Sequence, residues 1–256
     1  MDRTTELRLA EVVVESADTL RDDFQAEHYL RGMADHCVEL FGARTAGVMF
    51  THRTSEGRTI ALAPSNHQQE LATALLRSQQ NDGPCVESYS TGTTVAPVRL
   101  TETVTAIRWP EFTAQALEHG VTMTYAVPMR RGQSVFGVLN AFLSRQATPN
   151  GEVRCAEILA NAAALGLHNH EAYAGYRTLS RQLETALTSR IRVEQAKGIL
   201  AERWRTGMEP AFAALRGYAR RERLAIDRVA GELIDGKLDD ATLRPGRSEP
   251  DEPGPL

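Results

Sequence analysis

The sequence predicts an α+β fold in which a strand-containing N-terminal part is followed by an all-helical C-terminal part. Between residues 26 and 143, segments with apolar residues at helical spacing are interspersed with short strand-like segments. From residue 176 to residue 204 the chain is rich in helix formers, and Gly198 is the only Gly or Pro in that run. Two shorter amphipathic segments then follow. This order indicates an antiparallel sheet flanked by helices, followed by a small helical bundle.

The bulk properties indicate a soluble protein of two domains. At 256 residues, with 42% hydrophobic and 24% charged residues, the chain is long enough for two cores. No apolar run approaches the roughly 20 residues of a membrane helix, and residues 1–6 lack the pattern of a signal peptide. The three cysteines, Cys37, Cys85 and Cys155, form an odd, scattered set without a CxxC pair, which suggests a reducing compartment. We therefore expect a cytoplasmic protein without a membrane contact.

Local patterns place the N-terminal elements. We expect helices at 4–20, 26–41, 67–80, 110–119 and 150–174, and strands at 46–51, 59–63, 93–98, 123–129 and 133–143. In the first helix, Leu7, Val14 and Leu20 lie near one face. Gly42 follows the second helix, where a left-handed backbone is often needed, and breaker residues at 81–84 end the third. Turns at 55–57 and 130–132 join consecutive strands.

The run from 176 to 204 predicts a helix about 43 Å long. Its apolar residues recur at the spacing of a coiled-coil seam, at Tyr176, Leu179, Leu183, Ala186, Leu187 and Ile191. Such a stripe needs a partner surface. The simplest partner is the same helix of a second subunit, which makes a homodimer, and the alternative is packing against the N-terminal body.

Two shorter helices complete the predicted bundle. Residues 205–207 allow the chain to reverse, and Pro210 stands where a helix can begin without losing a needed N–H group. A third helix begins at 226 or 227, with Asp227 as its cap, and ends at 234 before Gly236. The middle helix turns its apolar stripe, Phe212, Leu215 and Ala219, toward the core. One basic face of the bundle then remains outside the core.

The charge changes sign along the chain. Residues 1–175 carry 14 Lys and Arg against 20 Asp and Glu, whereas residues 176–238 carry 13 against 8. The last 18 residues carry 2 against 5 and contain four prolines. A basic helical segment attached to an acidic body predicts a polyanionic partner. The tail at 239–256 is expected to be disordered, because it cannot bury a core.

The N-terminal part resembles a GAF domain, over residues 24–168. The phrases that carry this resemblance are residues 42–48, Gly-Ala-Arg-Thr-Ala-Gly-Val, residues 83–88, Gly-Pro-Cys-Val-Glu-Ser, and residues 137–141, Gly-Val-Leu-Asn-Ala. The resemblance implies a sensor domain with an unidentified small-molecule ligand. Residues 1–23 then form a separate N-terminal helix.

The C-terminal part, residues 169–238, resembles a linker helix and an ANTAR domain. Residues 195–198 read Gln-Ala-Lys-Gly, residues 211–216 read Ala-Phe-Ala-Ala-Leu-Arg with Ala219 after them, and residues 229–230 read Val-Ala. The start of the middle helix, Met208-Glu-Pro210, departs from the small polar cap of the family. The family binds paired stem-loops in nascent RNA and so prevents a terminator hairpin from forming. The resemblance therefore implies a GAF–ANTAR regulator of transcription antitermination.

We expect five residues of this bundle to contact RNA: Gln195, Lys197, Gly198, Arg216 and Arg220. Lys197 and Arg216 offer cations to phosphates or base edges, and Gln195 offers an amide to a base edge. Gly198 has no side chain, so a base can approach the backbone of the helix there. Arg220 adds electrostatic attraction for phosphate. This interpretation fails if Lys197 and Arg216 both turn inward into ion pairs, without a continuous cationic surface beside them.

Two other functions remain open. The three-helix end can act as a helix-turn-helix that binds duplex DNA, or the chain can be a small-molecule or redox module that only contacts other proteins. We expect no enzyme activity, cofactor or metal, because phosphate loops, nucleophile elbows and paired carboxylates are lacking. His168 and His170 have no spaced partners for a metal, and Cys85 is read as a small buried hydrophobe rather than a sensing thiol.

Overall fold

A computed structural model describes residues 3–54, 57–144 and 151–244 of the chain. It divides into two compact units, Met1–Ala174 and Gly175–Leu256, which are considered separately below. The expected domain boundary at 168/169 differs from this division by six residues. The reason is that one helix of 53 residues, α7 (Glu152–Trp204), replaces the two consecutive helices that we expected. Gly175 does not interrupt it, because a single glycine costs a helix only about 1 kcal/mol.

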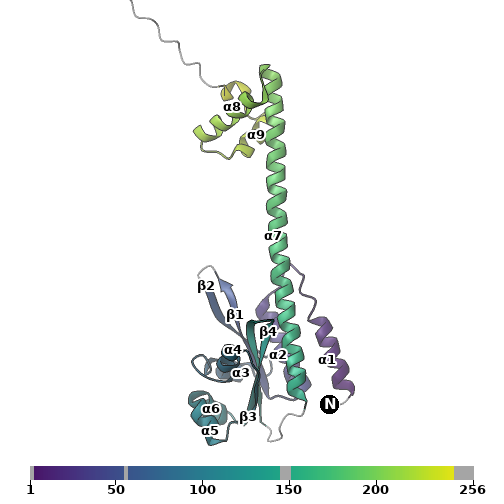
Figure 1. Cartoon of the computed structure of the whole chain (residues 1–256), viewed down its shortest axis with the longest axis vertical. Helices are drawn as coiled ribbons and strands as arrows, with labels where there is room; N and C mark the ends of the chain where they lie inside the picture. The colour runs from purple at the N-terminus through teal and green to yellow at the C-terminus, as the bar shows by residue number, and fades with distance from the viewer. Residues whose placement is uncertain (1–2, 55–56, 145–150, 245–256) are drawn as a thin grey trace, which may run out of the picture. The chain divides into compact units, whose positions relative to one another are not determined.

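The first unit contains a five-stranded antiparallel sheet, which confirms the predicted fold class (Figure 1). Its strands are β1 (Thr45–Thr54), β2 (Gly57–Pro64), β3 (Val95–Arg99), β4 (Met123–Arg131) and β5 (Ser134–Leu143), in the order β2-β1-β5-β4-β3. Side chains alternate between the two faces. On β1, Val48 and Phe50 face one hydrophobic cluster and Met49 faces the other. Both faces of the sheet are therefore buried.

Helices cover the two faces of the sheet. One cluster joins the sheet to α1 (Arg3–Glu15), α2 (Ala26–Phe41) and the first part of α7. The other joins it to α3 (Gln69–Arg77), α4 (Pro84–Thr91) and α6 (Pro110–Glu118), and α5 (Thr103–Arg108) precedes α6. Gly42 ends α2 with a φ of 60°, the left-handed conformation expected there.

Several local expectations were wrong. The first helix ends at Glu15 rather than at residue 20, and its buried residues are Leu9 and Val12. Leu7, Val14 and Leu20, the predicted apolar face, are exposed. Helices α4 and α5 were not predicted: α4 begins directly at Pro84, a favoured first residue of a helix that we had read only as a breaker. Part of the expected turn at 55–57 lies outside the described residues.

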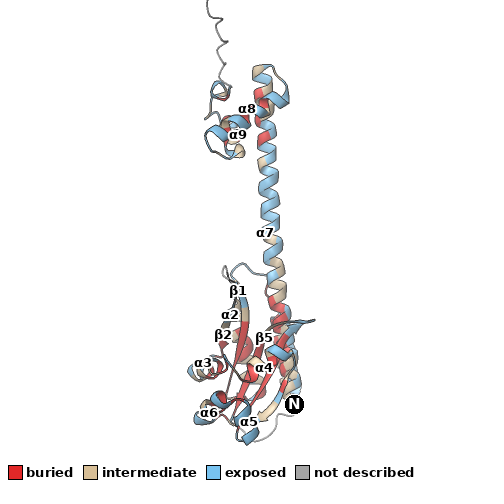
Figure 2. Ribbon diagram, turned by 60° about the vertical axis from the view of Figure 1, so that its left-hand side comes forward, coloured by how far each residue is buried: buried red, intermediate tan, exposed pale blue. Residues whose placement is uncertain are grey.

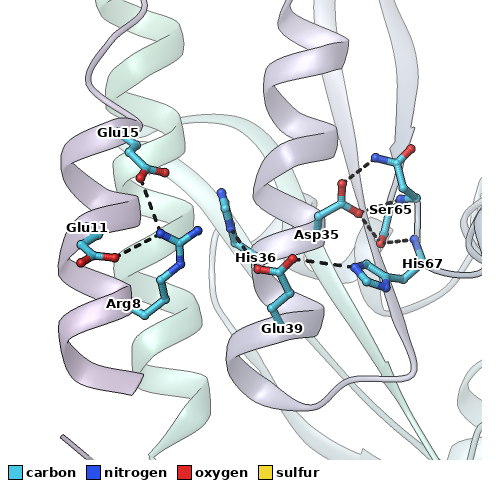
Figure 3. Close-up of polar contacts among 9 residues, drawn as sticks. Arg8, Glu11, Glu15, Asp35, His36, Glu39, Ser65 and His67 are labelled. Atoms are coloured by element: carbon cyan, nitrogen blue, oxygen red, sulfur yellow. Dashed lines mark hydrogen bonds and ion pairs between the residues drawn. The ribbon is translucent and has the colours of Figure 1, made fainter. Parts of the chain in front are cut away.

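A carboxylate fastens α2 to the end of β2 (Figure 3). Asp35 accepts hydrogen bonds from the Ser65 hydroxyl, from the Asn66 backbone N–H and from the Asn66 amide, each at 2.7 Å. Ser65 in turn accepts from the His67 N–H at 3.0 Å. These charge-assisted bonds fix the chain as it leaves the sheet.

The second unit contains the C-terminal part of α7, α8 (Met208–Arg221), α9 (Ile226–Ile234) and a short 3₁₀ helix, η1 (Asp240–Leu243). Figure 2 shows buried residues at this end of α7, whereas the preceding stretch of the helix is exposed. The expected cap of α9 was wrong: Ala225 holds that position without a side-chain bond, and Asp227 lies in the first turn. Disorder from residue 239 onward was also wrong for residues 239–244. Leu243 is buried in the bundle core, and the remaining tail lies outside the described residues.

Candidate nucleic-acid interface

The scaffold of the interface is a small core shared by α7, α8 and α9. Val193, Ala196 and Leu200 recur on α7 at spacings of three and four residues, so they face one side. Opposite them lie buried residues of the other helices, which are Ala211, Leu215, Ala219, Val229, Ala230 and Leu233. Because alanines occupy many of these positions, the helices pack closely and long polar side chains at the edges lie across the neighbouring helix.

Lys197 lies at the edge of this core. Its Nζ is 3.0 and 3.1 Å from the two carboxylate oxygens of Glu194, and only 12% of its side chain is exposed. The ammonium also lies 5.2 Å from the centre of the Phe212 ring on α8. Lys197 is therefore paired and mostly buried in the free protein, and its contact with RNA stays a prediction. Glu194 is half exposed and lies three residues away, so solvent reaches the carboxylate side of the pair.

Arg216 approaches the same aromatic ring from α8. Its guanidinium carbon is 5.5 Å from the Phe212 ring centre, and Arg216 is exposed. Among the described residues it has no carboxylate partner within ion-pair distance. Phe212 thus brings Lys197 and Arg216 together. Our sequence reasoning placed Phe212 only in the core, although its position four residues before Arg216 already indicated a shared face.

Gln195 and Gly198 do not join this group. Gln195 is exposed, but it is two residues from Lys197 and therefore about 200° away around the helix. At Gly198, a Cβ would meet no other atom within 4 Å. No contact within the described chain therefore requires glycine there. The two residues belong to the outward side of α7 rather than to the Lys197–Phe212–Arg216 edge.

Arg220 extends the edge by one helical turn. It is exposed and lies four residues after Arg216, so the two guanidinium groups share one side of α8. Arg221 differs, because it is already engaged: it lies 5.0 Å from the Tyr218 ring centre and pairs with Glu222 at 3.1 Å. The cationic surface on α8 is therefore made by Arg216 and Arg220, with the Lys197 ammonium beside them. This surface is smaller than the basic face that we expected.

In the first unit, Cys37, Cys85 and His170 are packed as structural groups. Cys37 and Cys85 are fully buried, and burial raises the pKa of both thiols to about 12. The Cys85 thiol accepts a hydrogen bond from the Asn140 amide at 3.3 Å, so it is a buried structural group. His170 stacks on Phe24 with ring centres 4.2 Å apart. Within the described ranges, His, Cys, Asp and Glu side chains nowhere gather in threes as for a metal ion, and no helix is long and apolar enough to span a membrane.

Comparison with protein families identifies the helical segment. Residues 181–234 match the family model described as the ANTAR domain. This segment is similar to ANTAR domains. The match begins on the exposed part of α7 and ends with α9, so it includes all five residues expected to contact RNA. It ends before η1, which therefore lies outside the matched residues.

Several solved structures similar to this chain are GAF domains or contain them. The GAF domain/HD domain protein from Geobacter sulfurreducens is 16% identical, with a TM-score of 0.45, over 59% of this chain and 97% of that one. The GAF domain of the Acinetobacter phosphoenolpyruvate-protein phosphotransferase is 12% identical, with a TM-score of 0.44, over 67% and 97%. Free methionine-R-sulfoxide reductase from Neisseria meningitidis is 15% identical, with a TM-score of 0.40, over 66% and 95%.

No curated protein matches the sequence. The ANTAR match agrees with the C-terminal part of the GAF–ANTAR architecture expected from the sequence. The ANTAR name denotes a regulatory domain, whereas one of the similar structures, the methionine-R-sulfoxide reductase, is an enzyme.

Proposed function

We propose that this protein is a cytoplasmic, signal-responsive regulator of transcription antitermination that binds paired stem-loops in nascent RNA. The ANTAR segment makes the RNA contact, and the N-terminal unit controls it. Neither unit acts as an enzyme in this proposal. Its site consists of Lys197, Arg216 and Arg220, with Gln195 and Gly198 on the outward side of α7.

One observation carries the proposal: Arg216 and Arg220 expose two cations on one side of α8, next to an aromatic ring, within the segment that matches the ANTAR family. Guanidinium groups bind phosphates and stack on unpaired bases, which are the features that an RNA loop presents. In this proposal an RNA phosphate replaces the half-exposed Glu194 carboxylate as the partner of Lys197.

Substitution of Arg216 tests the proposal. We expect Arg216→Ala to weaken binding of a tandem stem-loop RNA by about 1–3 kcal/mol, measured by titration at fixed salt. The matched control is Arg228→Ala on α9, which removes an equal charge from a residue paired with Glu232 at 2.9 Å. Equal losses in the two variants would show a general charge effect and count against this site. Preference of the wild-type protein for duplex DNA in the same salt would instead favour the helix-turn-helix alternative.

Dimerisation is part of the proposal, because the apolar stripe on α7 is uncovered. Tyr176, Leu179, Leu183, Leu187 and Ile191 are all exposed, and Leu183 is 62% exposed. Such a row on one helix is unfavourable in water, and the same row of a second copy covers it.

Leu183→Glu tests the dimer, and we expect it to shift the protein from dimer to monomer in sedimentation equilibrium. Thr185→Glu is the matched control, because position 185 lies about 200° away from Leu183 around the helix. A wild-type monomer, or equal dissociation of both variants, would refute pairing through this stripe.

The signal in this proposal is a small uncharged molecule bound by the first unit. A cleft of about 140 Å³ lies beside β1 and α4, lined by Met49, Phe50, Thr51, Ile60, Gln80, Val86 and Tyr89. None of these side chains is charged, so an ionic ligand finds no partner there. We expect thermal stabilisation of the protein by uncharged aromatic or aliphatic compounds of this size. Stabilisation by charged compounds alone would contradict the assignment.

A further inference from the structure

The segment that follows α9 closes onto the bundle at a second group of cations. The Asp239 carboxylate accepts a hydrogen bond from the Ala241 N–H at 3.1 Å and so starts η1. Leu243 anchors the segment, since it is 2% exposed and belongs to the bundle core. We call residues 239–244 the clasp. It is ordered, although the acidic, proline-containing sequence around it predicted disorder.

The clasp places one acid among basic and aromatic groups. Asp240 Oδ2 accepts a hydrogen bond from the Trp204 indole N–H at 2.7 Å, and its Oδ1 lies 3.5 Å from Arg203 Nη1. The hydrogen bond from Trp204, with the nearby Arg203 charge, lowers the pKa of Asp240 below its usual value. The group is therefore a carboxylate at neutral pH.

Two more arginines approach the same segment. The Arg244 guanidinium lies 5.5 Å from the centre of the Trp204 ring, and Arg221 donates to the Thr242 carbonyl at 3.5 Å. Three guanidinium groups thus lie on or beside the clasp: Arg203 pairs with Asp240, Arg221 pairs with Glu222, and Arg244 lies over the indole ring. Arg203 and Arg221 are about half exposed, so they remain accessible to a polyanion.

The chemistry of this group is that of a nucleotide site. An indole flanked by guanidinium groups offers a stacking surface for a base and donors for its phosphate. The Asp240 carboxylate supplies to Trp204 and Arg203 the negative oxygens that a phosphate would supply. The Arg244 guanidinium lies over the ring, where a base would stack.

We propose that Trp204, Arg203, Arg221 and Arg244 form a second RNA contact whose anionic position is filled in the free protein by the clasp residue Asp240. RNA displaces the clasp, so that Asp240 is an internal competitor that limits RNA affinity. This inference rests on RNA binding by the ANTAR segment, and it assigns a separate surface and a regulatory element to that binding.

Asp240→Asn is the direct test, because the amide keeps an oxygen for Trp204 but removes the charge. We expect the affinity for a tandem stem-loop RNA to rise about threefold to tenfold, because Arg203 then gains a phosphate without losing an ion pair. The slope of the logarithm of the binding constant against the logarithm of salt concentration should steepen by about the contribution of one phosphate contact. The matched control is Asp235→Asn, which removes the same charge from an exposed residue whose ion pair is with Lys237 at 2.9 Å.

Hydrogen exchange of the full-length wild-type protein gives a second measurement. We expect the amide of Ala241 to exchange faster when the stem-loop RNA is bound, because the clasp opens. Equal gains in affinity for both variants, no gain for Asp240→Asn, or unchanged or slower exchange at Ala241 would each overturn the inference. Titration of the wild-type protein shows whether it binds the stem-loop RNA at all. If it does not bind, the proposed function and this inference are both overturned.

Discussion

Replacing Phe212 by leucine tests whether one aromatic ring organises the candidate RNA site. The ring lies 5.2 Å from the Lys197 ammonium and 5.5 Å from the Arg216 guanidinium, so it holds a cation from each of two helices. Leucine keeps an apolar side chain at the edge of the bundle but removes the π face. Both cations then lose their contact with the aromatic ring.

The size of the effect follows from these contacts. A cation–π contact contributes about 0.5–1 kcal/mol where it is exposed, and more where water is excluded. Arg216 is exposed, whereas Lys197 is only 12% exposed, so the two contacts together amount to about 1–2 kcal/mol. If the RNA uses both cations in this arrangement, Phe212→Leu weakens stem-loop binding by about 5- to 30-fold.

Titration with a fluorescent stem-loop RNA measures this loss, and thermal unfolding of the same samples measures stability. Phe212→Tyr keeps the ring and should bind nearly as the wild type does. Phe24→Leu is the matched control, since the Phe24 ring stacks on His170 in the first unit, outside both proposed RNA surfaces. The proposed role of the ring is refuted if Phe212→Leu binds RNA with wild-type affinity, or if Phe24→Leu loses as much affinity for the same loss of stability.

Three further predictions concern the first unit. Gly137→Ala should lower the free energy of unfolding by more than about 2 kcal/mol in urea denaturation, because its Cβ would lie 2.6 Å from the Met49 carbonyl oxygen; wild-type stability would contradict this close approach. The free energy of unfolding should fall as pH rises from about 8.5 toward 12, because the buried thiols of Cys37 and Cys85 have a pKa of about 12 whereas unfolded thiols ionise near 8.5. Below pH 8.5 both states keep these protons, so the same urea titrations should show no thiol-linked change there; a loss of stability on acidification cannot come from these groups. At pH 8, iodoacetamide should modify Cys155 alone in the folded protein and all three cysteines in the unfolded one, as mass spectrometry of the products will show.

The elements that were predicted well have strong local signals. The second helix was placed at 26–41 and is observed as Ala26–Phe41, because its apolar spacing and the following Gly42 both mark the helix. The two strands around residues 130–132 were also found, since a turn separates two apolar runs. The short helices α4 and α5 escaped, because eight and six residues give too few turns for a periodic pattern.

The arrangement of the candidate site followed from the sequence only in part. Arg216 and Arg220 are exposed on one side of a helix, and their contact with RNA stays a prediction. Residue type and spacing were insufficient for Lys197, whose neighbours Glu194 and Phe212 decide whether its charge is available. Residue type and spacing also missed the clasp. Composition predicted disorder, whereas Leu243 is buried in a core formed by residues of three other helices.

The sequence by itself determined the order of the elements, the acidic and basic halves and the ANTAR motif, because these depend on neighbours within a few residues along the chain. Only the tertiary structure decided which cations are paired, which face of the first helix is buried, and that Asp240 lies against Trp204, 36 residues away. Contacts of this kind require distant segments to meet, and their energies depend on burial and distance rather than on residue type.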